Sequence, residues 1–252
     1  FHGLKEFDRR SRQLMAKCFY SEKWRIVGVS QAVVNDLSNK GLPKQRLVLI
    51  RNAIDSKALV EHQHSKSESR NKLGLPENQL IIGTLGRTKH VKGHDLLLEG
   101  IAPLCANNPN LHLVIMGGGE LEGSLNELAK KLNIVDRITI TGSLPNAYRY
   151  LKAIDIFIMP SRSEGLPIAM LEAMSTGLPT IGSNVGGIPE ALGDAGVIID
   201  ANSVAAVTEA LERMVNASDD ERKQMVDALQ ARISESFSIE GYHKAFRDLV
   251  AE

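Results

Sequence analysis

Short β-rich runs alternate with longer segments that are apolar at helical spacing, and this alternation limits the possible folds more than any other feature of the chain. The β-rich runs are residues 25–30, 47–50, 80–85, 111–116, 137–141, 155–159, 179–182 and 197–199. Helical segments between the later runs are residues 94–106, 120–132, 146–153, 167–176 and 203–216. The pattern predicts an α/β fold: a Rossmann-like parallel sheet with helices on both faces.

The two ends of the chain fit this scheme less well. Residues 1–44 supply a helix, a strand and a second helix before a Gly41-Leu42-Pro43 break, which is too little for a domain of its own. Residues 238–250 form one more amphipathic pattern. We therefore expect a main domain at 45–236, a remnant of a larger domain before it, and a separate helix at 237–252.

Composition narrows the possible partners and the compartment. In 252 residues, 30 Lys and Arg balance 30 Asp and Glu, so no net field favours nucleic acid. Cys18 and Cys105 lie far apart in helical patterns and are expected to be free thiols in a reducing compartment. No apolar run approaches the roughly 20 residues that span a bilayer, and no secretory segment opens the chain. We expect a cytoplasmic protein, and the first residue, Phe1, suggests a piece of a longer one.

A basic loop follows the run at 80–85. Its sequence, Gly86-Arg87-Thr88-Lys89-His90-Val91-Lys92-Gly93, leads from a predicted strand into a predicted helix. Loops at the carboxyl ends of strands line the ligand crevice of a doubly wound sheet. The forked guanidinium of Arg87 and the compact ammonium of Lys92 would suit a diphosphate there. Taken alone, the loop is better explained as a solvated surface loop.

Two glutamates follow the run at 155–159. Glu164 lies in the loop before the helix at 168–176, and Glu172 lies inside that helix. Apolar neighbours surround Glu172, which predicts burial and a need for partners that a ribose diol would meet. Free N–H groups at Gly165 and Leu166, with the helix dipole behind them, could receive a phosphate. The alternatives are that Glu164 caps the helix and that Glu172 pairs with a surface lysine.

Glycine-rich turns follow two other predicted strands. The turn at 185–190 allows close backbone approach at a third carboxyl end. The turn at 117–119 resembles a dinucleotide-binding loop, but the next strand ends in Gly142-Ser143, where a nicotinamide cofactor needs an acidic residue. We assign these glycines to backbone packing beside the same crevice. His90 and His94 straddle a loop-to-helix junction with no third ligand nearby, so no metal site is predicted.

Together these motifs resemble the retaining, family 4 glycosyltransferases of the GT-B fold. The similar elements are Gly86-Arg87, Lys92-Gly93, Gly117 to Gly119, Pro160-Ser161, Glu164-Gly165, Pro167, Glu172-Ala173-Met174, Gly177-Leu178-Pro179 and residues 186–190. The match runs from about Val29 to Phe237, and the two glutamates have the family's E-x7-E spacing. The resemblance implies two facing Rossmann-like domains, of which this chain is mainly the C-terminal, donor-binding one.

The same resemblance implies roles for the site residues. Arg87 and Lys92 are expected to bind the donor diphosphate and stabilise its charge, and Glu164 to contact the donor sugar near the reacting carbon. Glu172 is expected to hold the ribose hydroxyls. The other expected donor-site residues are Gly86, Gly118, Ser143, Leu144, Gly165, Leu166 and Pro167, with the Ser143-Leu144 turn against the base. No metal or other cofactor is expected, and the substrate is expected to be a UDP-sugar.

The implied activity is that of a hexosyltransferase-type enzyme of the EC 2.4 class, with a growing polysaccharide or glycolipid as acceptor, in the cytoplasm or peripherally at the membrane. Two features depart from the family. Ala53 replaces the glycine of the usual Asn-Gly-Ile-Asp, and most of the N-terminal domain, which supplies the acceptor site and a histidine, is absent. The alternatives are a donor-binding module that is inactive without that domain, and a nucleotide-sugar epimerase. Hydrolysis is disfavoured, because a glycosidase pair flanks the bond from both faces.

Overall fold

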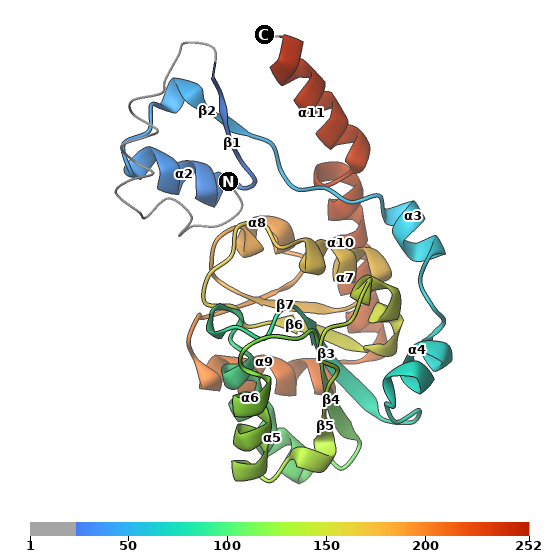
Figure 1. The fold of residues 1–252 in the computed structure, drawn as a ribbon. Coiled ribbons are helices and arrows are strands. Elements are labelled where there is room, and N and C mark those ends of the chain that lie inside the picture. Colours follow the sequence, from blue (N-terminus) through green and yellow to red (C-terminus); the bar gives the residue numbers. More distant parts are fainter. Residues whose placement is uncertain (1–23, 252) are drawn as a thin grey trace.

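The computed structural model describes residues 24–251 (Figure 1). Its main body is a sheet of six parallel strands in the order β5-β4-β3-β6-β7-β8. The strands are β3 (Leu80–Leu85), β4 (Leu111–Met116), β5 (Ile138–Ile140), β6 (Ile156–Met159), β7 (Thr180–Ser183) and β8 (Val197–Ile199). The predicted parallel sheet is confirmed. Relabelled within this body, the order is 3-2-1-4-5-6, that of a doubly wound Rossmann sheet.

Helices cover both faces of the sheet because its central strands are apolar on both sides. Ile156 and Ile158 of β6 belong to one core, and Phe157 and Met159 to the other. The first core is closed by α5 (His94–Asn107), α6 (Glu122–Lys131) and α9 (Val204–Asn216). The second is closed mainly by α7 (Ile168–Thr176), α8 (Ile188–Leu192) and α10 (Asp219–Ser236). Runs that are apolar on both sides are typical of parallel sheets.

The predicted helix at 146–153 differs from the observed element. Residues Ala147–Ala153 form a 3₁₀ helix, η4, rather than an α-helix. Asn146 precedes it in the left-handed conformation, with φ 52°, so the chain turns sharply into a segment of only seven residues. Three further 3₁₀ turns are η1 (Lys44–Arg46), η2 (His90–Lys92) and η3 (Val135–Arg137).

The polar segment before β3 contains two short helices, α3 (Ser56–Glu61) and α4 (Lys66–Leu73). Each begins at a capping side chain. Asp55 accepts from the Ala58 amide at 2.9 Å, and Ser65 from the Glu68 amide at 3.2 Å. Arg70 of α4 is only 2% exposed, so this segment contributes to the interior as well as to the surface.

A small unit precedes the main body. The strands β1 (Ile26–Gly28) and β2 (Leu47–Leu49) pair in parallel, with α2 (Gln31–Asn39) between them. The predicted strand and second helix of residues 1–44 are therefore present, whereas the predicted first helix lies outside the described residues. At the other end, α11 (Ile239–Ala251) leads away from the sheet, toward the side on which this unit lies (Figure 1). The predicted domain boundaries, 1–44, 45–236 and 237–252, stay predictions.

Candidate functional site

The sheet reverses its strand order between β3 and β6, which are hydrogen-bonded neighbours. In open α/β sheets, ligands bind outside the carboxyl ends of the strands at such a switch point. The two loops that leave this point are residues 86–93, after β3, and residues 160–167, after β6. They are the loops in which the sequence placed Arg87, Lys92 and Glu164.

The two loops pack closely. Gly93 has φ +68°, and a Cβ there would collide with the carbonyl oxygen of Pro160, so both the conformation and the contact require glycine. Arg162 ties the loops together further. Its amide donates to the Val91 carbonyl at 2.7 Å, and its guanidinium donates to the His90 carbonyl at 2.8 Å. The same guanidinium makes two bonds of 2.7 Å to the carboxylate of Asp95.

A cavity of about 410 Å³ opens beside these loops. Its lining contains five of the predicted site residues: Gly86, Arg87, Lys92, Pro167 and Glu172. Six lining residues were not predicted: Leu85, Asn146, Ala147, Tyr148, Ile168 and Ala169. The wall made by residues 146–148 comes from the start of η4, whose sequence carries no motif that would have singled it out.

Lys92 and Glu164 form an ion pair next to this cavity. The Lys92 Nζ atom lies 2.6 Å from Glu164 Oε1, and the Ser161 hydroxyl donates to the same oxygen at 2.7 Å. The Glu164 side chain is 9% exposed and that of Lys92 23%. Glu164 therefore does not cap α7, whose N-terminus has no side-chain cap. Ser161, completely buried, received no role in the sequence analysis.

Arg87 is exposed at the cavity, and its guanidinium forms no hydrogen bond or ion pair with any described residue. The backbone amides of Gly165 and Leu166 likewise donate to no acceptor within residues 24–251. Both amides precede the N-terminus of α7, which carries a partial positive charge. An unpaired guanidinium, an ammonium and free amides near a helix N-terminus are the groups that bind phosphates in proteins.

Glu172 also lines the cavity and is half-buried. Burial raises the pKa of its carboxyl from 4.5 to about 7. Its carboxylate forms no hydrogen bond or ion pair with another described side chain, so the alternative of a surface lysine partner is wrong. A carboxylate that is half-buried and unpaired in a cavity can accept two hydrogen bonds from a diol.

The remaining predicted residues lie beside the cavity rather than in its lining. Gly118 packs on the turn after β5, where an added Cβ would lie 2.6 Å from the Ser143 amide nitrogen. Its carbonyl accepts from the Thr88 amide at 3.1 Å, so the glycine turn packs against the basic loop as expected. Ser143 and its neighbour Leu144 do not line the cavity. The roles of Gly118, Ser143, Leu144, Gly165 and Leu166 stay predictions.

Residues 51–55 connect the small unit to the site. The Asn52 side chain donates to the Leu166 carbonyl at 2.7 Å, and Arg51 pairs with Glu190 of α8 at 2.5 Å. Ala53 has no positive φ, so alanine takes the place of the family's glycine without backbone strain. The departure from the family pattern therefore leaves this connection intact.

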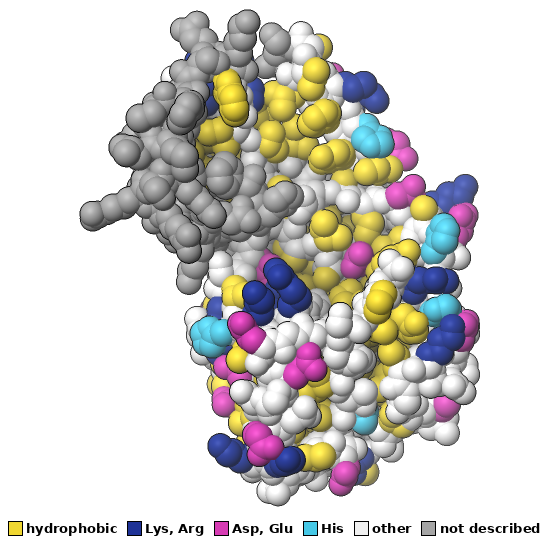
Figure 2. Space-filling view, viewed as in Figure 1, with side chains coloured by type: hydrophobic (Ala, Val, Ile, Leu, Met, Phe, Trp, Pro, Cys, Tyr) yellow, Lys and Arg dark blue, Asp and Glu magenta, His cyan; other side chains and the backbone are white. Residues whose placement is uncertain are grey.

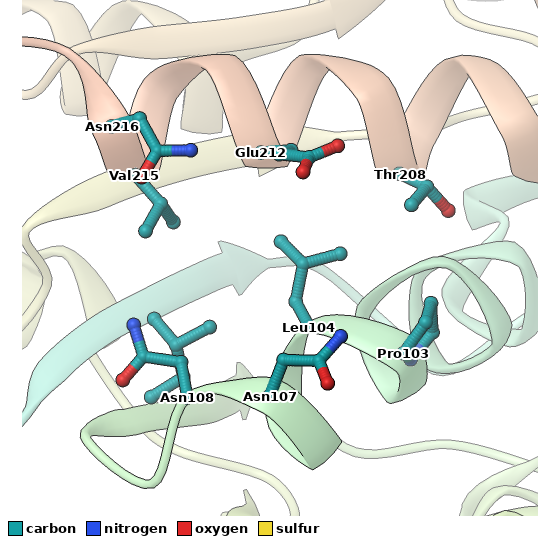
Figure 3. A pocket seen from close by; sticks show the side chains of 9 residues that line it. Pro103, Leu104, Asn107, Asn108, Thr208, Glu212, Val215 and Asn216 are labelled. Atoms are coloured by element: carbon teal, nitrogen blue, oxygen red, sulfur yellow. The ribbon is translucent and has the colours of Figure 1, made fainter.

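A second pocket, also of about 410 Å³, lies between α5 and α9 (Figure 3). Figure 3 shows Thr208, Glu212 and Val215 of α9 above Leu104 and Asn107 of α5. Asn107 ends α5 and Leu111, also in the lining, begins β4, so this pocket lies at the amino edge of the sheet. Ligands of doubly wound sheets bind at the other edge.

Residues 24–251 contain no group of three or more His, Cys, Asp or Glu side chains that could hold a metal ion. In the same range, no helix has both the length and the apolar character needed to cross a bilayer. Cys105 is a free, buried thiol as predicted, whereas Cys18 lies outside the described residues.

The sheet order, the switch-point loops and the cavity lined by cationic and acidic side chains define a Rossmann-like α/β protein with a candidate ligand site. The family model of glycosyl transferases group 1 matches residues 65–232, and the chain belongs to this family. The matched range includes both loops of the candidate site, residues 86–93 and 160–167. The family assignment therefore rests on the part of the chain that forms this site.

Two curated relatives are similar over most of the chain. The lipopolysaccharide core biosynthesis mannosyltransferase LpsB of Rhizobium meliloti is 31% identical over 76% of this chain and 57% of its own length. The D-inositol 3-phosphate glycosyltransferase of Mycolicibacterium smegmatis is 31% identical over 85% of this chain and 56% of its own. The chain thus spans a little over half the length of these relatives.

Solved structures confirm the fold class. Anabaena Alr3699/HepE, in complex with UDP and glucose, superposes with a TM-score of 0.85 at 18% identity, over 96% of this chain and 66% of that one. Sucrose-phosphate synthase from Thermosynechococcus elongatus gives a TM-score of 0.81 at 21% identity, over 98% of this chain and 63% of that one. The predicted fold, a Rossmann-like sheet of the GT-B type, is confirmed.

Proposed function

We propose that the cavity beside the loops 86–93 and 160–167 binds a nucleotide sugar. We further propose that the whole protein is a retaining, family 4 glycosyltransferase of the hexosyltransferase type. One observation carries the proposal. The unpaired Arg87, the Lys92 ammonium and the unpaired Glu172 carboxylate line a single cavity at the switch point of the sheet. Two cations suit a diphosphate, and the acidic group beyond them suits a ribose diol.

Chemistry at the diphosphate follows from these charges. Transfer breaks the bond between the anomeric carbon and the terminal phosphate oxygen, which keeps the electron pair and gains negative charge. Arg87 and Lys92 would stabilise that charge, together with the free amides near the start of α7. The acceptor hydroxyl oxygen then bonds the anomeric carbon, and its proton passes to the phosphate oxygen that has left. Because side chains supply the positive charge, we propose that the reaction needs no metal.

The relatives support particular substrates. Anabaena Alr3699/HepE was solved with UDP and glucose, which favours a UDP-sugar as donor. LpsB acts in lipopolysaccharide core biosynthesis, and the M. smegmatis relative on D-inositol 3-phosphate. We propose a carbohydrate or glycolipid acceptor, with the reaction in the cytoplasm or peripherally at the membrane surface.

The proposed partner of this donor-binding part is the N-terminal domain of the same protein. Tyr242, Phe246 and Val250 expose an apolar stripe along α11, and Val250 is 70% exposed. Figure 2 shows hydrophobic side chains gathered where α11 lies. The relatives are longer than this chain. An exposed apolar stripe of this kind marks an interaction surface, and a chain tested without that domain would bind donor but transfer no sugar.

Calorimetric titration of the chain with UDP, GDP and ADP tests the proposal. We expect saturable binding of UDP that is lost or weakened at least tenfold by Arg87→Ala and by Glu172→Ala. Lys89→Ala is the matched control, because Lys89 lies in the same basic loop but outside the cavity lining. A folded chain that binds none of the three nucleotides, or variants that bind UDP as tightly as the unchanged chain, would overturn it.

A further inference from the structure

The Glu164 carboxylate is held through one of its two oxygens. Lys92 Nζ and Ser161 Oγ both donate to Oε1, at 2.6 Å and 2.7 Å. Oε2 has no partner among the described residues. The carboxylate is therefore oriented by two donors on one side and keeps its second oxygen free to accept from a ligand.

Of these two donors, Lys92 is the one that can exchange Glu164 for a ligand. It lines the cavity, and its long side chain carries a compact charge that a diphosphate with at least two negative charges would attract more strongly than one carboxylate. Its backbone is fixed, since its amide donates to the Lys89 carbonyl at 2.9 Å and Gly93 abuts Pro160. A change of partner by Lys92 therefore requires only rotation of its side chain.

Ser161, by contrast, cannot move away from Glu164. It is completely buried, and its carbonyl accepts a hydrogen bond from the Ser183 hydroxyl at 2.5 Å. Its own side chain is short and has few rotamers. When Lys92 turns to the diphosphate, the Ser161 hydroxyl is the donor that remains on Oε1.

We propose that Ser161 is a positioning residue for the donor sugar: it holds Glu164 through Oε1, with Oε2 free for a sugar hydroxyl, while Lys92 moves to the diphosphate. This inference rests on the proposed function. It predicts that loss of the Ser161 hydroxyl weakens binding of the sugar part of the donor and leaves binding of the nucleotide part unchanged. A merely structural role would weaken both.

Calorimetry with UDP and UDP-glucose separates these cases. For Ser161→Ala we expect a UDP dissociation constant within twofold of the unchanged chain and a UDP-glucose constant about tenfold higher, as for loss of a hydrogen bond to a charged group. Ser175→Ala is the matched control, because it removes a buried hydroxyl that pairs with Ser56 and contacts neither Ser161 nor Glu164. In a Glu164→Ala background, Ser161→Ala should change neither constant further.

The results of this calorimetry distinguish a failure of the proposed function from a failure of the positioning role. If the unchanged chain binds neither ligand, the proposed UDP-sugar donor is wrong and the inference fails with it. If it binds both and Ser161→Ala weakens UDP and UDP-glucose equally, or weakens neither, the proposed function stands and the positioning role is wrong. Should UDP-glucose bind no more tightly than UDP to the unchanged chain, the same comparison is made with UDP-galactose and UDP-N-acetylglucosamine. A sugar contribution absent from all three contradicts the role assigned to Glu164 and Ser161.

Discussion

The guanidinium of Arg162 and the carboxylate of Asp95 form a two-pronged ion pair, with both N···O distances 2.7 Å, that joins the loop after β6 to the first turn of α5. Burial alone would raise the pKa of Asp95, but its hydrogen bonds and ion pair with Arg162 bring that pKa below its ordinary value. The pair therefore fixes the spacing between the loop of Glu164 and the loop of Arg87 and Lys92.

Replacing Arg162 by lysine should disturb this spacing, because lysine keeps the charge but cannot form the fork. We expect the free energy of unfolding to fall by about 1–2 kcal/mol and UDP to bind about tenfold more weakly. Urea denaturation and calorimetry measure the two effects. Lys130→Met, which breaks an exposed pair with Glu127, should change neither. Unchanged affinity in Arg162→Lys would mean that the loops keep their spacing without the fork.

Donor binding should depend on pH through Glu172. Burial raises the pKa of this carboxyl to about 7, so it is mostly protonated at pH 6 and mostly ionised at pH 8. Ribose hydroxyls donate to the ionised form, so UDP-glucose should bind more tightly as pH rises through 7, with release of a proton. UDP-glucose is the suitable probe because its phosphates do not titrate in this range.

Glu172→Gln is the matched variant for this prediction. It should bind UDP-glucose weakly and with little change in affinity between pH 6 and pH 8. Calorimetry at pH 7 in buffers of different ionisation enthalpy gives the proton release directly. A pH profile that is as steep in Glu172→Gln as in the unchanged chain would assign the titration to another group.

Acid should destabilise the fold through His94. Burial, with a smaller effect from the Lys92 charge, lowers the pKa of this imidazole from 6.5 to about 4, and neither ring nitrogen has a hydrogen-bond partner among residues 24–251. The unfolded chain therefore takes up a proton below pH 6.5, whereas the folded chain does so only near pH 4. The free energy of unfolding is therefore highest above pH 6.5 and decreases as the pH falls from 6.5 to 4. The decrease is about 2 kcal/mol at pH 5.

Chemical denaturation at pH 7 and pH 5 tests this dependence. His94→Met should lose about 2 kcal/mol less than the unchanged chain on going from pH 7 to pH 5. His243→Met is the control, because it removes a histidine that is exposed on α11 rather than buried. Equal acid losses in His94→Met and in the unchanged chain would contradict the assignment.

The buried Arg70 should be a major determinant of stability. It pairs with Asp155 at 2.7 Å and donates to the carbonyls of Ala153 and Gln79, each at 3.1 Å, and of Glu77. Arg70→Met should lower the free energy of unfolding by about 3–5 kcal/mol, since it leaves those acceptors unpaired. Lys66→Met removes the exposed partner of the same carboxylate and should cost less than about 1 kcal/mol. Similar losses in the two variants would show that burial is not what makes Arg70 important.

The sequence predicted the elements of this fold well because they are periodic. The runs at 80–85 and 111–116 coincide with β3 and β4, and Arg87, Lys92 and Glu172 do meet in one cavity. Strand periodicity and the rule that carboxyl ends share one edge were sufficient for both results.

The parts that were missed depend on contacts between residues far apart in the chain. The fork between Arg162 and Asp95 joins positions 67 residues apart, and the cavity wall at residues 146–148 depends on a left-handed Asn146 that no periodicity predicts. Ser161 stood inside a recognised motif, but only the geometry places its hydroxyl on Glu164. Local patterns predict elements, whereas side-chain partners across loops follow from packing.

The most direct test of the donor site is amide hydrogen exchange of the chain with and without saturating UDP-glucose. The two pockets of about 410 Å³ make the test decisive, because they lie at opposite edges of the sheet. We predict slower exchange in peptides that cover residues 86–93, 146–148 and 164–172, and no change in those that cover 103–108 and 208–216. Protection confined to the pocket between α5 and α9, or none at either pocket with the ligand bound, would contradict the account.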